Sequence, residues 1–261
     1  ISYYEKNFSD YEDLLEIRRL DVAAYKENVS IVKGLAQPYE KFVEKYKNSA
    51  AYALYGRRQL QETNVLEDTG MMDAYNKAER AQIKAYELDP ENARAILLRG
   101  IFSSLSSFNV DDELLEKAVS IAPESLDVLM GVGTAYRLGR KPLRAVEIYE
   151  KALDIVPLPP TDAKLNYLRA LIDSKKFSKA ESISEEMKVS DKYSSYWGNL
   201  FLIYIKFENN EKDDAARLYK EFSKLNKVSL DDIISEIESY PWSWDVWYKI
   251  TLVDTLREID K

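Results

Sequence analysis

The segment from Leu126 to Pro159 contains two helical patterns, separated by Gly139 and closed by Pro157. Similar patterns occur about 34 residues before and after it, which is the length of one repeating helix pair. A chain with such a period builds its core by stacking neighbouring helix pairs along an axis, rather than around a single centre. The sequence therefore predicts an all-α protein.

Small and bulky apolar residues occupy fixed places in this segment: Leu129, Gly133, Tyr136, Ala145, Tyr149, Ala152 and Pro157. With these residues the segment resembles one tetratricopeptide repeat, in which two antiparallel helices approach closely at some points and leave space at others. We expect Gly133 and Ala145 to lie where the helices cross, and Tyr136 and Tyr149 to fill the gap to the next pair. The resemblance implies a right-handed superhelical α-solenoid of about six antiparallel helix pairs plus a C-terminal cap.

The same register can be followed along most of the chain. The resemblance covers residues 48–228, as repeats at approximately 48–91, 92–125, 126–159, 160–193 and 194–228. Repeat 92–125 departs from the pattern by carrying Arg99 where a small residue is usual. Repeat 48–91 carries about ten extra residues around Asn64 to Met71, which would lengthen its helices and could project from the stack. Residues 1–47 are interpreted as an N-terminal helical capping pair, and the Trp-rich residues 229–261 as C-terminal capping helices.

The composition argues against catalysis. Histidine and cysteine are both absent, so the commonest general base, the commonest transition-metal ligands, thiol nucleophiles and disulfides are excluded. The glycines form no phosphate-binding run, and the acidic residues lack the calcium-loop pattern. The sequence predicts no catalytic residue, no metal site and no cofactor, and hence a protein that is not an enzyme.

The formal net charge of −8 disfavours nucleic acid and anionic membranes as partners. The basic residues between Arg137 and Arg144 are interpreted as a solvated turn and helix start rather than a binding patch. No run of about 18 apolar residues occurs, so we expect no direct membrane insertion. The chain starts at Ile1 without methionine and lacks cysteine, which favours an extracytoplasmic location, periplasmic or lipid-anchored in a bacterium, over the cytoplasm.

In proteins that the chain resembles, the first helices of successive repeats line a concave groove, and fixed places in each repeat contact the ligand. The resemblance implies partner-binding residues at Ile96, Asp127, Met130, Thr134, Arg137, Leu165 and Arg169. One subtype clamps a peptide carboxylate with Lys and Asn at the places held here by Met130 and Thr134, so that version is disfavoured. The alternative interpretation is that Ile96, Met130 and Leu165 simply pack between repeats.

Three of the four tryptophans, Trp242, Trp244 and Trp247, lie within six residues near the C-terminus. Such large aromatic side chains need burial. We expect them to pack against the last repeat, and the alternative is a second contact site for a partner or another copy of the chain.

The sequence thus predicts a non-enzymatic scaffold or adaptor that binds a peptide or helix of a protein partner in its groove. Two alternatives stay open. The chain could be a self-associating assembly protein, a homo-oligomer held by its aromatic C-terminal region, or a small-ligand or transporter accessory module with a pocket in the solenoid.

Overall fold

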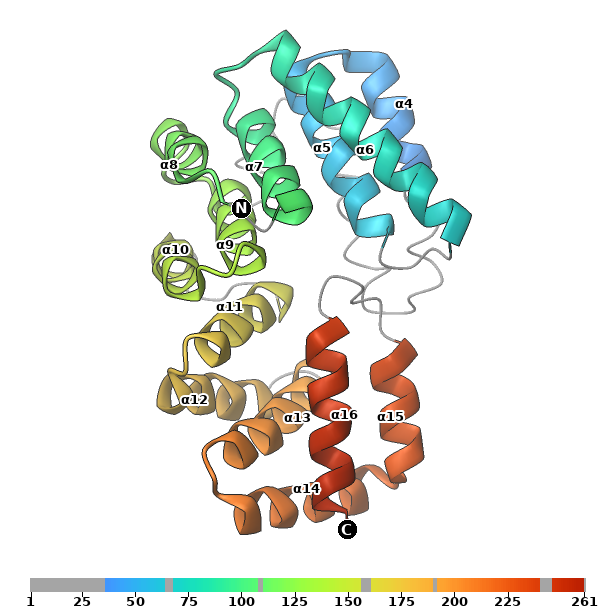
Figure 1. Cartoon of the computed structure of the whole chain (residues 1–261), viewed down its shortest axis with the longest axis vertical. Helices are drawn as coiled ribbons and strands as arrows, with labels where there is room; N and C mark the ends of the chain where they lie inside the picture. The colour runs from blue at the N-terminus through green and yellow to red at the C-terminus, as the bar shows by residue number, and fades with distance from the viewer. Residues whose placement is uncertain are drawn as a thin grey trace. The chain divides into compact units, whose positions relative to one another are not determined.

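The computed structural model describes residues 36–63, 68–107, 110–155, 161–189, 192–239 and 246–260 (Figure 1). Within these ranges the chain forms thirteen α-helices and no strand, which confirms the predicted all-α class. The helices belong to two compact units, residues 1–158 and residues 159–261. The repeat pattern predicted one array over residues 48–228, and the boundary between the units falls at the end of the repeat 126–159.

The first unit contains α4 to α10. Their bounds are Ala36–Tyr46 (α4), Ser49–Glu62 (α5), Asp68–Leu88 (α6), Ala93–Ser107 (α7), Asp112–Ile121 (α8), Leu126–Leu138 (α9) and Pro142–Ile155 (α10). Helices α5, α7 and α9 are the first helices of three pairs, and α6, α8 and α10 are the second helices. Each first helix packs against its own second helix, and α7 packs against the first helices on both sides of it, α5 and α9. The core of this unit therefore runs along the row of pairs.

Residues in and around the turn determine where α9 ends and α10 begins. Pro142 starts α10, where its missing N–H costs nothing because the first N–H groups of a helix have no partner within the helix. Arg140, in the turn, takes a left-handed conformation with φ of 58°. A Cβ atom at Gly133 would lie 2.6 Å from Cε1 of Tyr149, so the buried tyrosine ring packs against the bare backbone of α9. We expected Tyr149 to reach the next pair, and the structure shows this ring filling space within its own pair.

In the preceding pair, α7/α8, different residues allow the two helices to approach closely. Arg99 does not lie at the crossing point, as the sequence register suggested. It is exposed and its guanidinium lies 4.3 Å from the centre of the Tyr86 ring. The neighbouring Gly100 supplies the close approach, since a Cβ there would lie 2.3 Å from Cδ2 of Leu115. The small residue is therefore displaced by one position in this repeat.

The extra residues expected around Asn64 to Met71 fall partly outside the described residues, which omit 64–67. Residues 68–71 form the first turn of α6. This helix has 21 residues, against 14 in α5 and 14 in α10. At least part of the extra length is therefore helix.

The second unit contains α11 to α16. Their bounds are Thr161–Asp173 (α11), Phe177–Lys188 (α12), Lys192–Glu208 (α13), Lys212–Asn226 (α14), Leu230–Ser239 (α15) and Val246–Ile259 (α16). Helix α13 is central, because every residue from Leu200 to Ile205 is at most 2% exposed. A helix buried on all its faces must be covered on every side, and α11, α12, α14 and α16 all pack against α13. The first of the two C-terminal helices, α15, packs against α16.

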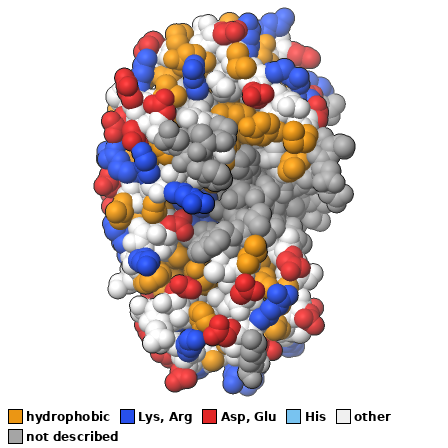
Figure 2. Space-filling model, in the orientation of Figure 1, with side chains coloured by type: hydrophobic (Ala, Val, Ile, Leu, Met, Phe, Trp, Pro, Cys, Tyr) orange, Lys and Arg blue, Asp and Glu red, His pale blue; other side chains and the backbone are white. Residues whose placement is uncertain are grey.

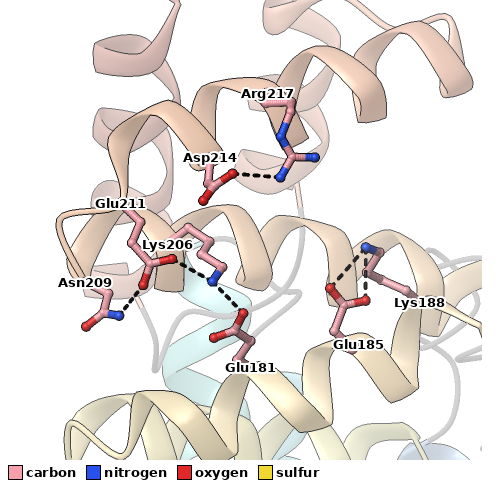
Figure 3. Close-up of polar contacts among 8 residues, drawn as sticks. All are labelled: Glu181, Glu185, Lys188, Lys206, Asn209, Glu211, Asp214 and Arg217. Carbon is pink, nitrogen blue, oxygen red and sulfur yellow. Dashed lines mark hydrogen bonds and ion pairs between the residues drawn. The ribbon is translucent and has the colours of Figure 1, made fainter.

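A polar network connects three helices of this unit on their outer side (Figure 3). Nζ of Lys206, near the end of α13, lies 2.6 Å from a carboxylate oxygen of Glu181 in α12 and 2.7 Å from one of Glu211 at the start of α14. Asn209 also donates to Glu211. These bonds raise the pKa of Lys206 above its usual range and lower the pKa of Glu211 below its usual range.

Replacing Lys206 by methionine should make the second unit less sensitive to acid. The folded-state pKa of Glu211 is depressed, so the unfolded chain binds more protons and stability is lost as the pH falls through the carboxylate range. Without the lysine, that pKa returns towards its ordinary value and the loss shrinks. Melting temperatures from pH 7 to pH 3, followed by circular dichroism, measure the change. Lys224→Met, on the exposed side of α14, is the matched control and should keep the wild-type slope.

Candidate functional site

Helix α9 exposes one narrow stripe of side chains. Asp127, Met130, Thr134 and Leu138 are half-buried, whereas the residues between them are buried. Their spacing of three and four residues places them on a single face of the helix. We call these four residues the α9 stripe. It contains three of the predicted partner-binding residues, and it is the part of α9 that another molecule can reach.

The charged end of the stripe is a cluster of three side chains from three successive first helices. Nη1 of Arg57, in α5, donates to Oδ1 of Asp127 at 2.6 Å and to its backbone oxygen at 3.3 Å. Nε of Arg94, in α7, donates to Oδ2 of the same carboxylate at 3.3 Å. The side chains are 21%, 21% and 11% exposed for Arg57, Arg94 and Asp127. One carboxylate therefore holds two guanidinium groups together, and the cluster carries an excess positive charge.

The local sequence explains why these groups meet. Oδ1 of Asn92 accepts hydrogen bonds from the backbone N–H groups of Arg94 and Ala95, which caps α7 and fixes Arg94 in its first turn. Asp127 lies in the first turn of α9, where the helix dipole stabilises a carboxylate. The first helices of successive repeats start at the same edge of the stack. The packing of α7 against α9 therefore brings Arg94 and Asp127 together.

The middle of the stripe is held by Thr134. Its hydroxyl donates to the backbone oxygen of Met130 at 2.9 Å and lies 3.1 Å from the hydroxyl of Tyr149. This contact ties the stripe to the tyrosine that packs against Gly133, so the outer surface of α9 and its packing to α10 are coupled. Met130 lies between Asp127 and Thr134 and is the apolar residue of the stripe nearest to the charged cluster.

The other predicted partner-binding residues are buried in the structure. Ile96 in α7 is 0% exposed and Arg137 in α9 is 9% exposed. In the second unit, Leu165 and Arg169 of α11 are 2% and 5% exposed. Nη1 of Arg169 donates to Asn166 at 3.2 Å. This burial favours the packing alternative for Ile96 and Leu165 but not for Met130.

The aromatic C-terminal candidates cannot be placed as side chains. Trp242 and Trp244 lie outside the described residues, and Trp247 falls in α16, whose described side chains begin at Ile250. Their role as packing residues or as a second contact site stays a prediction.

Arg57 and Arg94 were missed by the sequence analysis. Arg57 lies 70 residues from Asp127 and Arg94 lies 33 residues from it, so no local spacing connects the three. The available signal was weaker: α5, α7 and α9 contain arginine but no lysine. Arginine at a half-buried position often marks a paired or recognising group.

Across the described ranges, no group of three or more acidic residues is arranged to hold a metal ion. None of the helices there is long and apolar enough to cross a membrane.

Comparison with solved structures places this arrangement among known folds. The structure of PilW, described as a type IV pilus biogenesis factor, aligns with 81% of this chain and 90% of its own, at a TM-score of 0.53 and 20% identity. Yeast Tom70 aligns with 87% of this chain at a TM-score of 0.51 and 16% identity, and the match spans 44% of Tom70. The chain has the tetratricopeptide-repeat fold. No protein-family model and no curated protein sequence matches it.

The fold confirms the family resemblance that residues 126–159 indicated, and with it the expectation of paired helical repeats. A tetratricopeptide repeat protein from Parabacteroides merdae also aligns, over 98% of this chain and 97% of its own, with a TM-score of 0.49 and 15% identity. At these identities the likeness concerns the fold.

Replacing Asp127 by asparagine should lower the free energy of unfolding by about 1–2 kcal/mol, because charge-assisted hydrogen bonds from two arginines are lost and two guanidinium groups are left facing each other. Urea denaturation followed by circular dichroism measures it. Asp112→Asn is the control. The Asp112 carboxylate, at the start of α8, pairs with Lys141 and is 50% exposed. Its loss should therefore lower the free energy of unfolding by at most about 0.5 kcal/mol. Equal effects of the two variants would contradict a special role for the cluster.

Proposed function

We propose that this protein is a non-enzymatic scaffold or adaptor, and that it binds a peptide or helix of a protein partner along the α9 stripe. The observation that carries the proposal is the stripe itself, with the Arg57, Arg94 and Asp127 cluster at one end. Half-buried charged groups next to reachable apolar side chains are typical of recognition surfaces. The tetratricopeptide-repeat fold supports the same role.

The stripe also narrows the predicted site. Asp127, Met130 and Thr134 stay in the proposal as contact residues. Ile96, Arg137, Leu165 and Arg169 become supporting residues that hold the helices in place, since a partner cannot contact side chains that are buried. A substitution such as Leu165→Glu would therefore disturb folding rather than test binding.

A site-specific photo-crosslinking amino acid tests the proposal. Placed at Met130, on the stripe, it should form a covalent adduct with a partner in cells of the source organism. Placed at Lys151, exposed on the second helix α10, it serves as the matched control and should give no such adduct. Mass spectrometry of the adducts identifies the partner and the cross-linked peptide.

The outcomes separate the alternatives. Adducts with one distinct protein from Met130 alone support the scaffold. Adducts of the chain with itself support the self-associating alternative, which sedimentation velocity over a hundredfold concentration range checks independently. The same adducts from both positions, or none from Met130, contradict the proposed site. The extracytoplasmic location belongs to this proposal as well, and cell fractionation with an antibody to the chain tests it.

A further inference from the structure

The charges of the first unit are segregated between first and second helices. Helices α5, α7 and α9 carry five arginines, no lysine and two carboxylates. Helices α6, α8 and α10 carry ten carboxylates and six basic residues. The chain as a whole is acidic, with a net charge of −8. The positive balance of the first helices therefore runs against the composition of the protein.

Two basic residues at the start of α10 pair with carboxylates of α8. Nζ of Lys141 lies 2.5 Å from a carboxylate oxygen of Asp112, and Nη2 of Arg144 lies 2.5 Å from one of Glu116. Figure 2 shows acidic and basic side chains interleaved on the side where α8 and α10 lie. Carboxylates nevertheless outnumber basic residues on the second helices, so their charge balance is negative, opposite in sign to that of the first helices.

Arg57 differs from these residues. Within the part of the chain that the structure describes, its hydrogen bonds all go from Nη1 to Asp127. A guanidinium has five N–H donors in a planar fork. The side chain is 21% exposed, so Nε and Nη2 of Arg57 can bind an acceptor from another molecule. The bond to Asp127 fixes the orientation of the fork before that acceptor arrives, which lowers the entropic cost of binding.

The rest of the stripe gives a second chemical requirement. Met130 and Leu138 are apolar and partly exposed, and Thr134 between them already donates its hydrogen bond to the Met130 oxygen. Moving along α9 from Asp127, the reachable surface changes from charged to apolar. A partner that matches it presents a carboxylate at one end and apolar side chains beyond it.

We propose that the α9 stripe binds an acidic, apolar-bearing peptide segment of a partner protein, with a carboxylate of that segment on Arg57. This inference rests on the proposed function and names the class of its partner. A polyphosphate is a poorer match, because Asp127 lies within the cluster and the neighbouring stripe is apolar. A basic segment would meet the excess positive charge of the cluster and be repelled.

Two fluorescein-labelled, end-capped peptides of twelve residues probe the site. The first repeats Glu-Glu-Leu-Asp-Glu-Leu, and the second has lysine in place of each acidic residue. Fluorescence anisotropy measures their affinity for the full chain. We expect the acidic peptide to bind at least about tenfold more tightly, and its affinity to fall when sodium chloride is raised, because salt screens the interaction.

Variants locate the binding. Arg57→Gln should lower the affinity for the acidic peptide by about tenfold, since a charge-assisted bond is lost. Met130→Glu and Met130→Lys leave the cluster intact. The first should lower the affinity for the acidic peptide, and the second should raise it. Arg217→Gln is the control, because that arginine is 59% exposed on α14 of the second unit. The affinity of this variant for the acidic peptide should match that of the wild type. Circular dichroism checks that each variant is folded.

Equal affinity for the two peptides, no binding of either, or an unchanged affinity in both Met130 variants would overturn the proposed partner class. The photo-crosslinking result at Met130 does not depend on the charge of the partner. A specific adduct combined with no preference for the acidic peptide would therefore leave the scaffold standing and remove only the acidic segment.

Discussion

Tyr149→Ala is expected to lower the free energy of unfolding of the first unit by about 3–5 kcal/mol, which is the usual cost of removing a buried aromatic side chain. The ring is 0% exposed and fills the space that Gly133 leaves open. In the variant, α9 and α10 would face each other across a cavity, because the glycine offers no side chain to close it. The hydroxyl contact with Thr134 is lost as well.

Two optical signals separate the two units in this experiment. All four tryptophans, the first being Trp197, lie after residue 158, so tryptophan fluorescence reports on the second unit and circular dichroism on both. In urea, the circular dichroism transition of Tyr149→Ala should shift to lower concentration, and the fluorescence transition should shift less. Tyr149→Phe keeps the ring and should cost only about 1 kcal/mol. A similar loss in both variants would mean that the ring does not pack as described.

The pair α9/α10 could be predicted from the sequence because its signals are local. Gly139 and Pro142 mark the turn, and the apolar spacing on either side gives both helices. The structure places the helices at Leu126–Leu138 and Pro142–Ile155, inside the segment 126–159 from which the fold was inferred. The helices of such a segment can be predicted because local helix propensity and the repeat pattern agree.

The candidate site was only partly predictable. The stripe residues on α9 follow from helix periodicity once the start of the helix is known. Which neighbours they meet depends on how successive first helices stack, and the bond between Arg57 and Asp127 is such a contact between repeats. The burial of Ile96 and Leu165 depends on the same stacking, so the sequence left the binding and packing interpretations open.

The crossing points show how a one-residue difference escapes sequence alignment. In α9 the glycine stands at 133 and meets a tyrosine, and in α7 it stands at 100 and meets a leucine. Counting back by one repeat length from Gly133 reaches Arg99, whose long side chain would not fit there. The helix instead presents the adjacent Gly100, and Arg99 lies over Tyr86. Close packing of neighbouring helices selects the small residue, whatever its place in the count.

Gly198→Ala is expected to lower the free energy of unfolding of the second unit by about 3 kcal/mol, at the upper end of the range for overpacking. A Cβ at Gly198 would lie 2.8 Å from the backbone oxygen of Ser184 and 3.0 Å from the backbone nitrogen of Lys188. Both atoms belong to the main chain of α12, so no side chain can rotate away. Helices α12 and α13 would have to move apart, and the buried surface of α13 would lose contacts along its length.

The substitution also tests which of two opposing effects dominates. Alanine favours a helix over glycine by about 1 kcal/mol, so an open site would be stabilised by the same change. Ser195→Ala, half-buried three residues earlier in α13, provides that comparison and should leave stability unchanged or slightly raised. Urea denaturation followed by tryptophan fluorescence measures both variants. A gain of stability in Gly198→Ala would show that α12 and α13 are not in close contact at this point, and the central position of α13 in the second unit would have to be abandoned.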